Sequence, residues 1–311
     1  MPAEEKLHDP WLVAVWPGMG GVAISAGYYL MAKLGMHLLL EFPATEFFDL
    51  EQVEVKDGII LSKRLPRSRL FLWDDPAKKH DLILFIGEAQ PPARGGAFCR
   101  KLIDQAKTLG VRRVFTFAAM ATPMRPKQDS RVFSAAIDRE TLAEFKQLDL
   151  HILENGNISG LNGVLLGMAA ASGLPGGCLL GEIPHVFSQI PFPKASLTVL
   201  ESFCVMTGIE IDFTELRDHA KTVESTLEDF LVRMEQAVEE AHTQPGHLPE
   251  PDDNGDKTPR REAADRQRIE ALFTEARNDR SRAYELKQEL DRLGLFGEFE
   301  DRFLDLFKEP G

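Results

Sequence analysis

Apolar residues up to about residue 242 follow two alternating patterns. Short, nearly continuous apolar runs alternate with longer segments in which apolar residues recur at three- and four-residue spacing. The runs predict strands buried on both faces of a sheet, and the spaced segments predict amphipathic helices. Their alternation predicts an α/β fold with a doubly wound, mostly parallel sheet. The predicted strands span residues 11–16, 36–42, 82–87, 114–119, 132–136, 151–153 and 178–182, and the predicted helices span residues 20–34, 98–109, 138–148, 160–172, 194–207 and 214–242.

One segment between these units has the pattern of an antiparallel hairpin. Val53 and Val55 alternate with polar residues, Asp57-Gly58 supplies the two residues of a tight turn, and Ile59 begins a second apolar stretch. This pattern predicts a β-hairpin arm, because Asp-Gly suits the positive φ angles of a type I′ turn. Residues 70–73 are a candidate for one more strand.

The composition changes after residue 242. Residues 243–265 contain four prolines and a run of acidic residues, with almost no apolar side chain. A segment of this composition cannot bury enough apolar surface to fold alone, so it predicts a flexible linker. The sequence therefore divides into an α/β domain at 1–242, a linker at 243–265 and a C-terminal tail at 266–311.

The tail carries apolar residues at helical spacing over residues 269–293 and again after Gly297. This spacing predicts a helical hairpin with one apolar face on each helix. Faces this apolar need cover, either from the chain's own domain or from another subunit, and the sequence leaves both open. The candidate residues for protein interaction are Leu286, Leu290, Leu293, Phe299, Phe303 and Phe307.

Charge and composition exclude several classes of function. The 49 acidic and 36 basic residues give a formal charge of −13, which disfavours binding to nucleic acid. The sequence contains neither an apolar run long enough to cross a membrane nor a secretory signal at its start, so we expect a cytoplasmic protein. Cys99, Cys178 and Cys204 lie far apart and are expected to be buried, reduced thiols, with no metal site and no cofactor.

The first candidate ligand site is the glycine-rich loop after the first predicted strand. Gly18, Gly20 and Gly21 stand between a strand and a helix, and Glu41 ends the next predicted strand. This is the layout of a dinucleotide site, in which glycines let the backbone approach a pyrophosphate and an acid binds the ribose hydroxyls. Glycines that only form a tight turn are the more common explanation of such a pattern.

Two further loops follow predicted strands, where α/β folds place their ligands. One loop offers amide and hydroxyl groups that suit an anion or, alternatively, left-handed turns and a helix cap. The other carries Arg125 and Arg131, which suit a phosphate or a partner's carboxylate or, alternatively, ion pairs within the chain. The candidate residues of the first loop are Asn155, Asn157, Ser159 and Asn162.

The sequence predicts no catalytic residues. His151, Glu154, Glu182 and His185 lie on or just after predicted strands, but nothing in their spacing brings them together. A nucleophile elbow, a phosphate-binding P-loop and an H-E-x-x-H motif are all absent from the sequence. The sequence therefore gives no positive indication of enzyme activity.

Five stretches, in order, resemble the proteasome-assembly-chaperone family. None is diagnostic alone, and together they extend over roughly residues 11–242. The stretches are Pro17-Gly18-Met19-Gly20-Gly21, residues 84–91 (LFIGEAQP), Thr122-Pro123-Met124-Arg125-Pro126, residues 158–166 (ISGLNGVLL), and Gly181-Glu182-Ile183-Pro184 leading to residues 191–195 (PFPKA).

The resemblance implies a doubly wound fold similar to nucleoside phosphorylases without their catalytic residues, oligomers of the chain, and protein partners. Chaperones of this family often end in a hydrophobic-Tyr-x motif that inserts between proteasome subunits. Here residues 307–311 read FKEPG, without a tyrosine, so direct docking to the proteasome is not predicted. The first hypothesis is a non-catalytic assembly or scaffold protein, and the alternative is an enzyme that binds a nucleotide or small metabolite at the strand-end loops.

Overall fold

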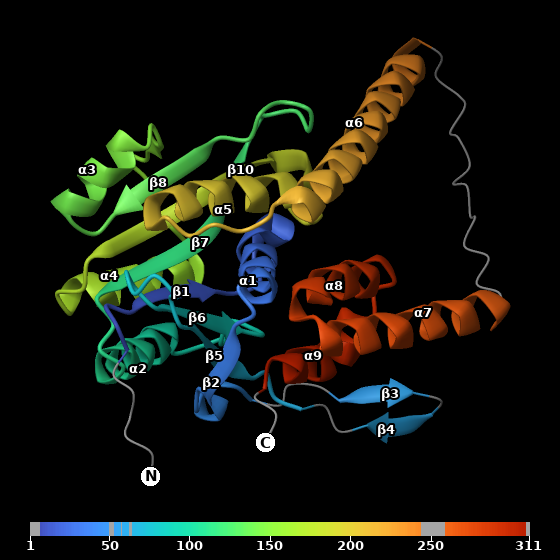
Figure 1. Ribbon diagram of the computed structural model, residues 1–311. Coiled ribbons are helices and arrows are strands. Elements are labelled where there is room, and N and C mark those ends of the chain that lie inside the picture. The colour runs from blue at the N-terminus through green and yellow to red at the C-terminus, as the bar shows by residue number, and fades with distance from the viewer. Residues whose placement is uncertain (1–6, 50–52, 57, 62–63, 244–258, 309–311) are drawn as a thin grey trace.

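A mixed eight-stranded sheet forms the centre of the molecule. The computed structural model describes residues 7–49, 53–56, 58–61, 64–243 and 259–308 (Figure 1). The strands lie in the order β2-β5-β6-β1-β7-β10-β8-β9, and β6, β1, β7 and β10 are parallel neighbours. Their bounds are β1 Trp11–Val15, β2 His37–Glu41, β5 Ser68–Trp73, β6 Leu82–Gly87, β7 Arg113–Thr122, β8 Val132–Ala136, β9 His151–Ile152 and β10 Gly176–Pro184.

Helices cover both faces of the sheet, which confirms the predicted α/β class. One apolar core lies between the sheet and helices α1, α5 and α6, and a second lies between the sheet and helices α2 and α4. Strands β1, β6 and β10 are buried throughout, as their continuous apolar runs predict. The helices are α1 Val22–Lys33, α2 Gly95–Thr108, α3 Arg139–Gln147, α4 Gly160–Ala171, α5 Pro193–Thr207 and α6 Thr214–Thr243.

Two features of the N-terminal half depend on the sheet order. The predicted hairpin arm forms from β3 (Glu54–Lys56) and β4 (Ile59–Leu61), and it projects from the sheet (Figure 1). Strand β2, expected to be buried on both faces, is instead an edge strand with half-buried side chains. Strand β5 enters between β2 and β6 and runs antiparallel to both, which moves β2 away from β1.

In its described residues, the C-terminal tail contains three α-helices where the sequence predicts two helices. They are α7 (Pro259–Asn278), α8 (Ala283–Arg292) and α9 (Phe296–Leu304). The predicted helix over 269–293 is broken at Asp279, whose carboxylate accepts a hydrogen bond from the Ser281 amide at 3.0 Å and caps a new turn. Helix α7 also begins at Pro259, inside the segment predicted as linker, whose residues 244–258 lie outside the described part.

The tail packs on the chain's own α/β domain, against α1 and strand β5 of the sheet. The Tyr28 ring contacts Phe296 and Phe303 with centroid distances of 5.3 Å and 5.6 Å. The Phe307 ring lies edge-on to Phe71 of β5 at 6.3 Å. In this arrangement the tail contacts its own domain, which is one of the two alternatives that the sequence leaves open.

Helix α6 runs outward from the body of the molecule (Figure 1). Its first half buries Leu216, Ala220 and Leu227 against the core, whereas Phe230 and Met234 further along are exposed. Among the described residues, none of the helices is both long and apolar enough to span a membrane. All three cysteines are buried and unpaired, as predicted, and burial raises the pKa of each thiol to about 12.

Candidate functional site

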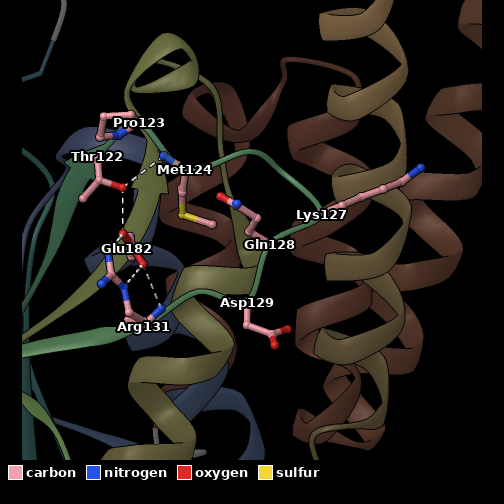
Figure 2. Close-up of a pocket in the computed structure, with 8 residues that line it drawn as sticks. All are labelled: Thr122, Pro123, Met124, Lys127, Gln128, Asp129, Arg131 and Glu182. Atoms are coloured by element: carbon pink, nitrogen blue, oxygen red, sulfur yellow. Dashed lines mark hydrogen bonds and ion pairs between the residues drawn. The ribbon is translucent and has the colours of Figure 1, made fainter.

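The carboxyl ends of β7 and β10 form an open cleft of about 630 Å³. It lies at the edge of the sheet where α/β proteins commonly hold their ligands. Residues 123–131 connect β7 to β8 and form the rim of this cleft. The lining residues are Thr122, Pro123, Met124, Lys127, Gln128, Asp129, Arg131 and Glu182 (Figure 2).

A buried carboxylate occupies the floor of the cleft. The Glu182 side chain, on β10, is only 1% exposed. Its carboxylate accepts hydrogen bonds from the Arg131 Nε at 2.8 Å and from the Thr122 hydroxyl at 2.7 Å (Figure 2). Burial alone would raise the pKa of Glu182, but these hydrogen bonds outweigh it and hold the pKa below its ordinary value. Glu182 is therefore a charged, fully paired group and not a free acid or base.

The cation predicted to clamp a ligand, Arg125, is also paired within the chain. Its Nε donates to Glu228 at 3.0 Å and its Nη1 donates to Glu235 at 2.9 Å, and both carboxylates belong to α6. Lys194 of α5 pairs with Glu224 of α6 at 2.8 Å and donates to the Gln128 carbonyl at 2.6 Å. The loop over the cleft is thus fastened to α6, which is the ion-pair alternative for Arg125.

The glycine-rich loop after β1 is held by backbone hydrogen bonds within the chain. The Gly20 amide donates to the Ser188 carbonyl at 2.7 Å, and the Gly21 amide donates to the Gly18 carbonyl at 3.0 Å. Glu41 ends β2, which β5 and β6 separate from β1, and it lies 3.5 Å from Arg69. The two amides and the acid that would hold a dinucleotide therefore have other partners and do not converge.

The asparagine-containing loop before α4 lies beside the glycine-rich loop but is held by a different residue. Ser159 is at the N-cap position without a side-chain hydrogen bond to the helix. Gln90 takes that role, because its Oε1 accepts from the Leu161 amide and its Nε2 donates to the Pro17 carbonyl, both at 3.1 Å. Asn155 and Asn157 are exposed to solvent.

Asn162, in the first turn of α4, has a buried Oδ1 without a hydrogen-bond partner among the described residues. The side chain as a whole is only partly buried. This orphaned oxygen is the one feature of the loop that suits a ligand, and the loop otherwise fits a helix start shaped by backbone geometry.

Of the four possible acid–base residues, two come together. The Glu182 carboxylate and the His185 Nδ1 both contact Thr122, the latter at its carbonyl oxygen at 3.0 Å. His151 and Glu154 lie at β9, at the far edge of the sheet beyond β8. Among the described residues, no cluster of three or more His, Cys, Asp or Glu side chains is placed to hold a metal ion.

Exposed apolar side chains gather along the same carboxyl edge, on three segments that contact one another. They come from the turn after β1, the segment after β10 and the outer half of α6, and sequence spacing did not single them out. The Gly20–Ser188 hydrogen bond joins the first two segments, and the Phe187 and Phe230 rings, 6.1 Å apart, join the second to α6. We name this surface the apolar rim, and its members are Met19, Val186, Ile190, Phe230 and Met234.

The tail residues predicted to bind partners are used inside the chain. Leu286, Leu290, Phe303 and Phe307 are fully buried against the α/β domain and the other tail helices. Leu293 and Phe299 are partly buried against the same core. Among the described residues, the large apolar side chains that face solvent lie on the apolar rim, on the β3–β4 hairpin and at isolated helix positions, and none of them lies in the tail.

Most of the chain is similar to known proteins. The model of the PAC2 family matches residues 12–231. An uncharacterized protein of Methanocaldococcus jannaschii, MJ1210, is 26% identical over 250 residues, which cover 78% of this chain and 90% of that protein. Tail helices α7–α9 lie beyond the part of the chain that the family model matches.

Solved structures share the fold. Pyrococcus furiosus PbaB, described as an archaeal proteasome activator, is 26% identical with a TM-score of 0.62, and the match covers 73% of this chain and 95% of PbaB. Mycobacterium tuberculosis Rv2125, described as a proteasome-assembly chaperone homologue, is 22% identical with a TM-score of 0.60, and the match covers 71% of this chain and 94% of Rv2125. At this identity, the similarity to Rv2125 shows a shared fold.

Proposed function

Because this chain belongs to the PAC2 family, as the five sequence stretches indicate, we propose that it is a non-catalytic assembly protein. It binds other proteins and associates with copies of itself, in the cytoplasm. The description of PbaB as an archaeal proteasome activator supports a role that involves other proteins. For this chain we propose the general role of an assembly protein whose partner is another protein.

The apolar rim is the observation that carries this proposal. Phe230 and Met234 are 52% and 50% exposed, and they continue the apolar stripe by which α6 packs on the domain. Burying a side chain of this size contributes up to about 1.5–3 kcal/mol, so a partner that covers the rim gains several such contributions. Contiguous apolar side chains on a soluble surface mark sites of protein interaction.

The neighbouring cleft supports the same interpretation. Its carboxylate, Glu182, is neutralised by Arg131, and its rim loop is fixed to α6 by Arg125. Charged groups that are already paired are poorly placed to activate a substrate, but they give the edge a fixed shape. We infer that these ion pairs hold loop 123–131 and α6 in position, so that the apolar rim has a fixed shape before a partner protein binds.

Size-exclusion chromatography with light scattering tests self-association. The full chain is expected to form oligomers, and the double substitution Phe230→Asp with Met234→Asp is expected to shift it to monomers. Val205→Asp is the matched control, because Val205 is 69% exposed on α5, outside the rim. A full chain that stays monomeric at high concentration would contradict self-association, and equal effects of the rim and control substitutions would contradict the role of the rim.

A further inference from the structure

A second surface, which is charged and aromatic, lies beneath α9, where β5 begins beside the carboxyl end of β6. Three arginines near the start of β5 all contact one tail carboxylate, that of Asp301. Arg64 Nε lies 2.7 Å from it, Arg67 Nη1 lies 3.2 Å from it, and Arg69 Nη2 lies 2.8 Å from it. A cluster of this kind is a charge-assisted site for a carboxylate.

The domain itself neutralises these arginines only in part. Glu88 accepts from Arg69 at 3.0 Å and also pairs with Arg64, and Glu41 lies 3.5 Å from Arg69. Two carboxylates thus face three guanidinium groups once α9 is set aside. In a chain with a formal charge of −13, this surface is a local positive site that fits an acidic ligand.

Aromatic contacts give the same surface a second kind of selectivity. Tyr28 of α1 receives Phe296 and Phe303 of α9, and Phe71 of β5 receives Phe307. Edge-to-face ring pairs of this type favour aromatic side chains over other apolar ones. We name the surface formed by Tyr28, Arg64, Arg67, Arg69 and Phe71 the arginine–aromatic face.

The fit of α9 to this face is imperfect at one residue. The partly buried Glu300 carboxylate lies near Glu88, accepts from the Tyr28 hydroxyl at 3.1 Å, and lies 3.8 Å from Arg64. Burial and the charge of Glu88 disfavour its ionised form. A docked helix with one unfavourable group is held less tightly than its other contacts would allow.

We propose that the arginine–aromatic face is a docking site for an acidic, phenylalanine-bearing helix of a partner protein, and that α9 is the resident occupant that such a helix displaces. Charge complementarity carries the proposal, since Asp301 satisfies all three arginines at once. The position of α9 beyond the part matched by the family model supports it, because the face belongs to the matched domain and its cover does not. This site is separate from the apolar rim, and its test does not depend on self-association.

A labelled peptide of residues 294–308 of this chain serves as the probe, and its binding to the full chain is followed by fluorescence anisotropy. The full chain carrying Asp301→Ser and Phe303→Ser is expected to release α9 and to bind the peptide about tenfold or more tightly than the unaltered chain, because the face is then free. Hydrogen exchange of α9 measures the release directly. Adding Arg67→Glu to this variant is expected to weaken peptide binding about tenfold.

Controls separate docking from loss of structure. The same peptide with both serine substitutions is expected not to bind, and β6 should stay protected from exchange in every variant. Asp301→Asn alone, which keeps the shape of the side chain, should give an intermediate affinity. If α9 is released but the peptide binds no more tightly, the docking site is wrong; if α9 stays protected after both substitutions, these contacts do not hold it, and the proposal fails as well.

Discussion

The Asp301 carboxylate accepts a hydrogen bond from the Arg69 guanidinium at 2.8 Å, across 232 positions of the sequence. Arg69 is only 2% exposed, so this contact places a tail carboxylate against a buried cation of the sheet. A buried charge needs a partner close by, because its desolvation is otherwise uncompensated. Arg69 already pairs with Glu88 of its own domain at 3.0 Å, so the contact adds a second close carboxylate and couples α9 to β5.

Removing the charge of Asp301 should loosen the tail. Asp301→Asn keeps the shape of the side chain but weakens three charged contacts, and we expect a loss of about 1–3 kcal/mol in the free energy of tail docking. Hydrogen exchange of the α9 amides measures this loss. Asp305→Asn is the control, since the ion pair of Asp305 within the described part of the chain is with the exposed Lys308. Equal protection of α9 in the two variants would contradict the anchoring role of Asp301.

Tail docking should depend on pH through Glu300. Burial and the nearby Glu88 raise the pKa of Glu300 from 4.5 to about 7. A group whose pKa is higher when docked contributes its full stability below its undocked pKa and loses it as the pH rises through the docked pKa. Docking is therefore expected to weaken by about 1–3 kcal/mol between pH 4.5 and 7 and to level off above pH 7.

The comparison of the unaltered chain with Glu300→Gln isolates this effect from other titrations. In the variant, protection of α9 from hydrogen exchange should lose its dependence on pH over this window. A slope that is the same in both proteins would assign the effect to another residue. The groups that face Glu300 from neighbouring elements are Tyr28, Arg64, Arg69, Glu88 and Lys287.

Breaking the Glu182 pair should destabilise the domain more than breaking an exposed pair. Arg131→Ala leaves the Glu182 carboxylate buried with Thr122 as its remaining side-chain donor. Arg217→Ala is the control, because Arg217 and Glu201 form a pair at 2.8 Å in which both side chains are well exposed. Urea denaturation should show a loss of stability roughly threefold larger for Arg131→Ala. Similar losses for the two variants would mean that Glu182 remains solvated.

A pair of glycine substitutions tests the structural role of the turn after β1. Gly20 and Gly35 have nearly the same positive φ, 60° and 57°, but a Cβ on Gly20 would lie 3.2 Å from Ile183 whereas Gly35 faces open space. Gly35→Ala should cost about 1 kcal/mol from backbone conformation alone. Gly20→Ala should cost about 1 kcal/mol more, from crowding. Thermal denaturation measures both, and equal shifts would show that the turn tolerates added volume.

The same samples test the alternative function. Because the Gly20 and Gly21 amides already have carbonyl partners, we expect no shift of the melting temperature on adding NAD or ATP. A shift of the melting temperature that is seen in the unaltered chain and disappears in Gly20→Ala would support a nucleotide site at this loop. This measurement needs no assumption about a substrate.

The sequence predicts the elements of this fold better than their arrangement. Continuous apolar runs identify β1 and β6 because both faces of those strands are covered. The same kind of apolar run gives a wrong prediction for β2. Strand β2 lies at the edge of the sheet because β5 pairs with β6, and the sequence of β2 carries no sign of that pairing. The break at Asp279 was missed because apolar spacing continues across it, although an aspartate two positions before a serine is a recognisable turn signal.

The sequence predicts which type of contact the candidate site makes, but not the partner residues. A cationic loop after a buried strand indicates charged contacts, and Arg125 and Arg131 do make them. Their partners lie on β10 and α6, which are far away in sequence, so spacing cannot identify them. The better signal was Glu182 itself, since a carboxylate inside an apolar strand must be paired. The apolar rim has no periodic pattern because three separate segments build it.

The inaccessibility of Cys99, Cys178 and Cys204 has a practical consequence for work on this molecule. Thiol-reactive dyes attack the thiolate, and burial both hides these sulfurs and keeps them protonated. A single cysteine introduced at an exposed position, in place of Lys308 beside α9 or Val205 on α5, would thus be labelled selectively while all three native cysteines are kept. The native chain already provides the unreactive background that spectroscopic distance measurements require.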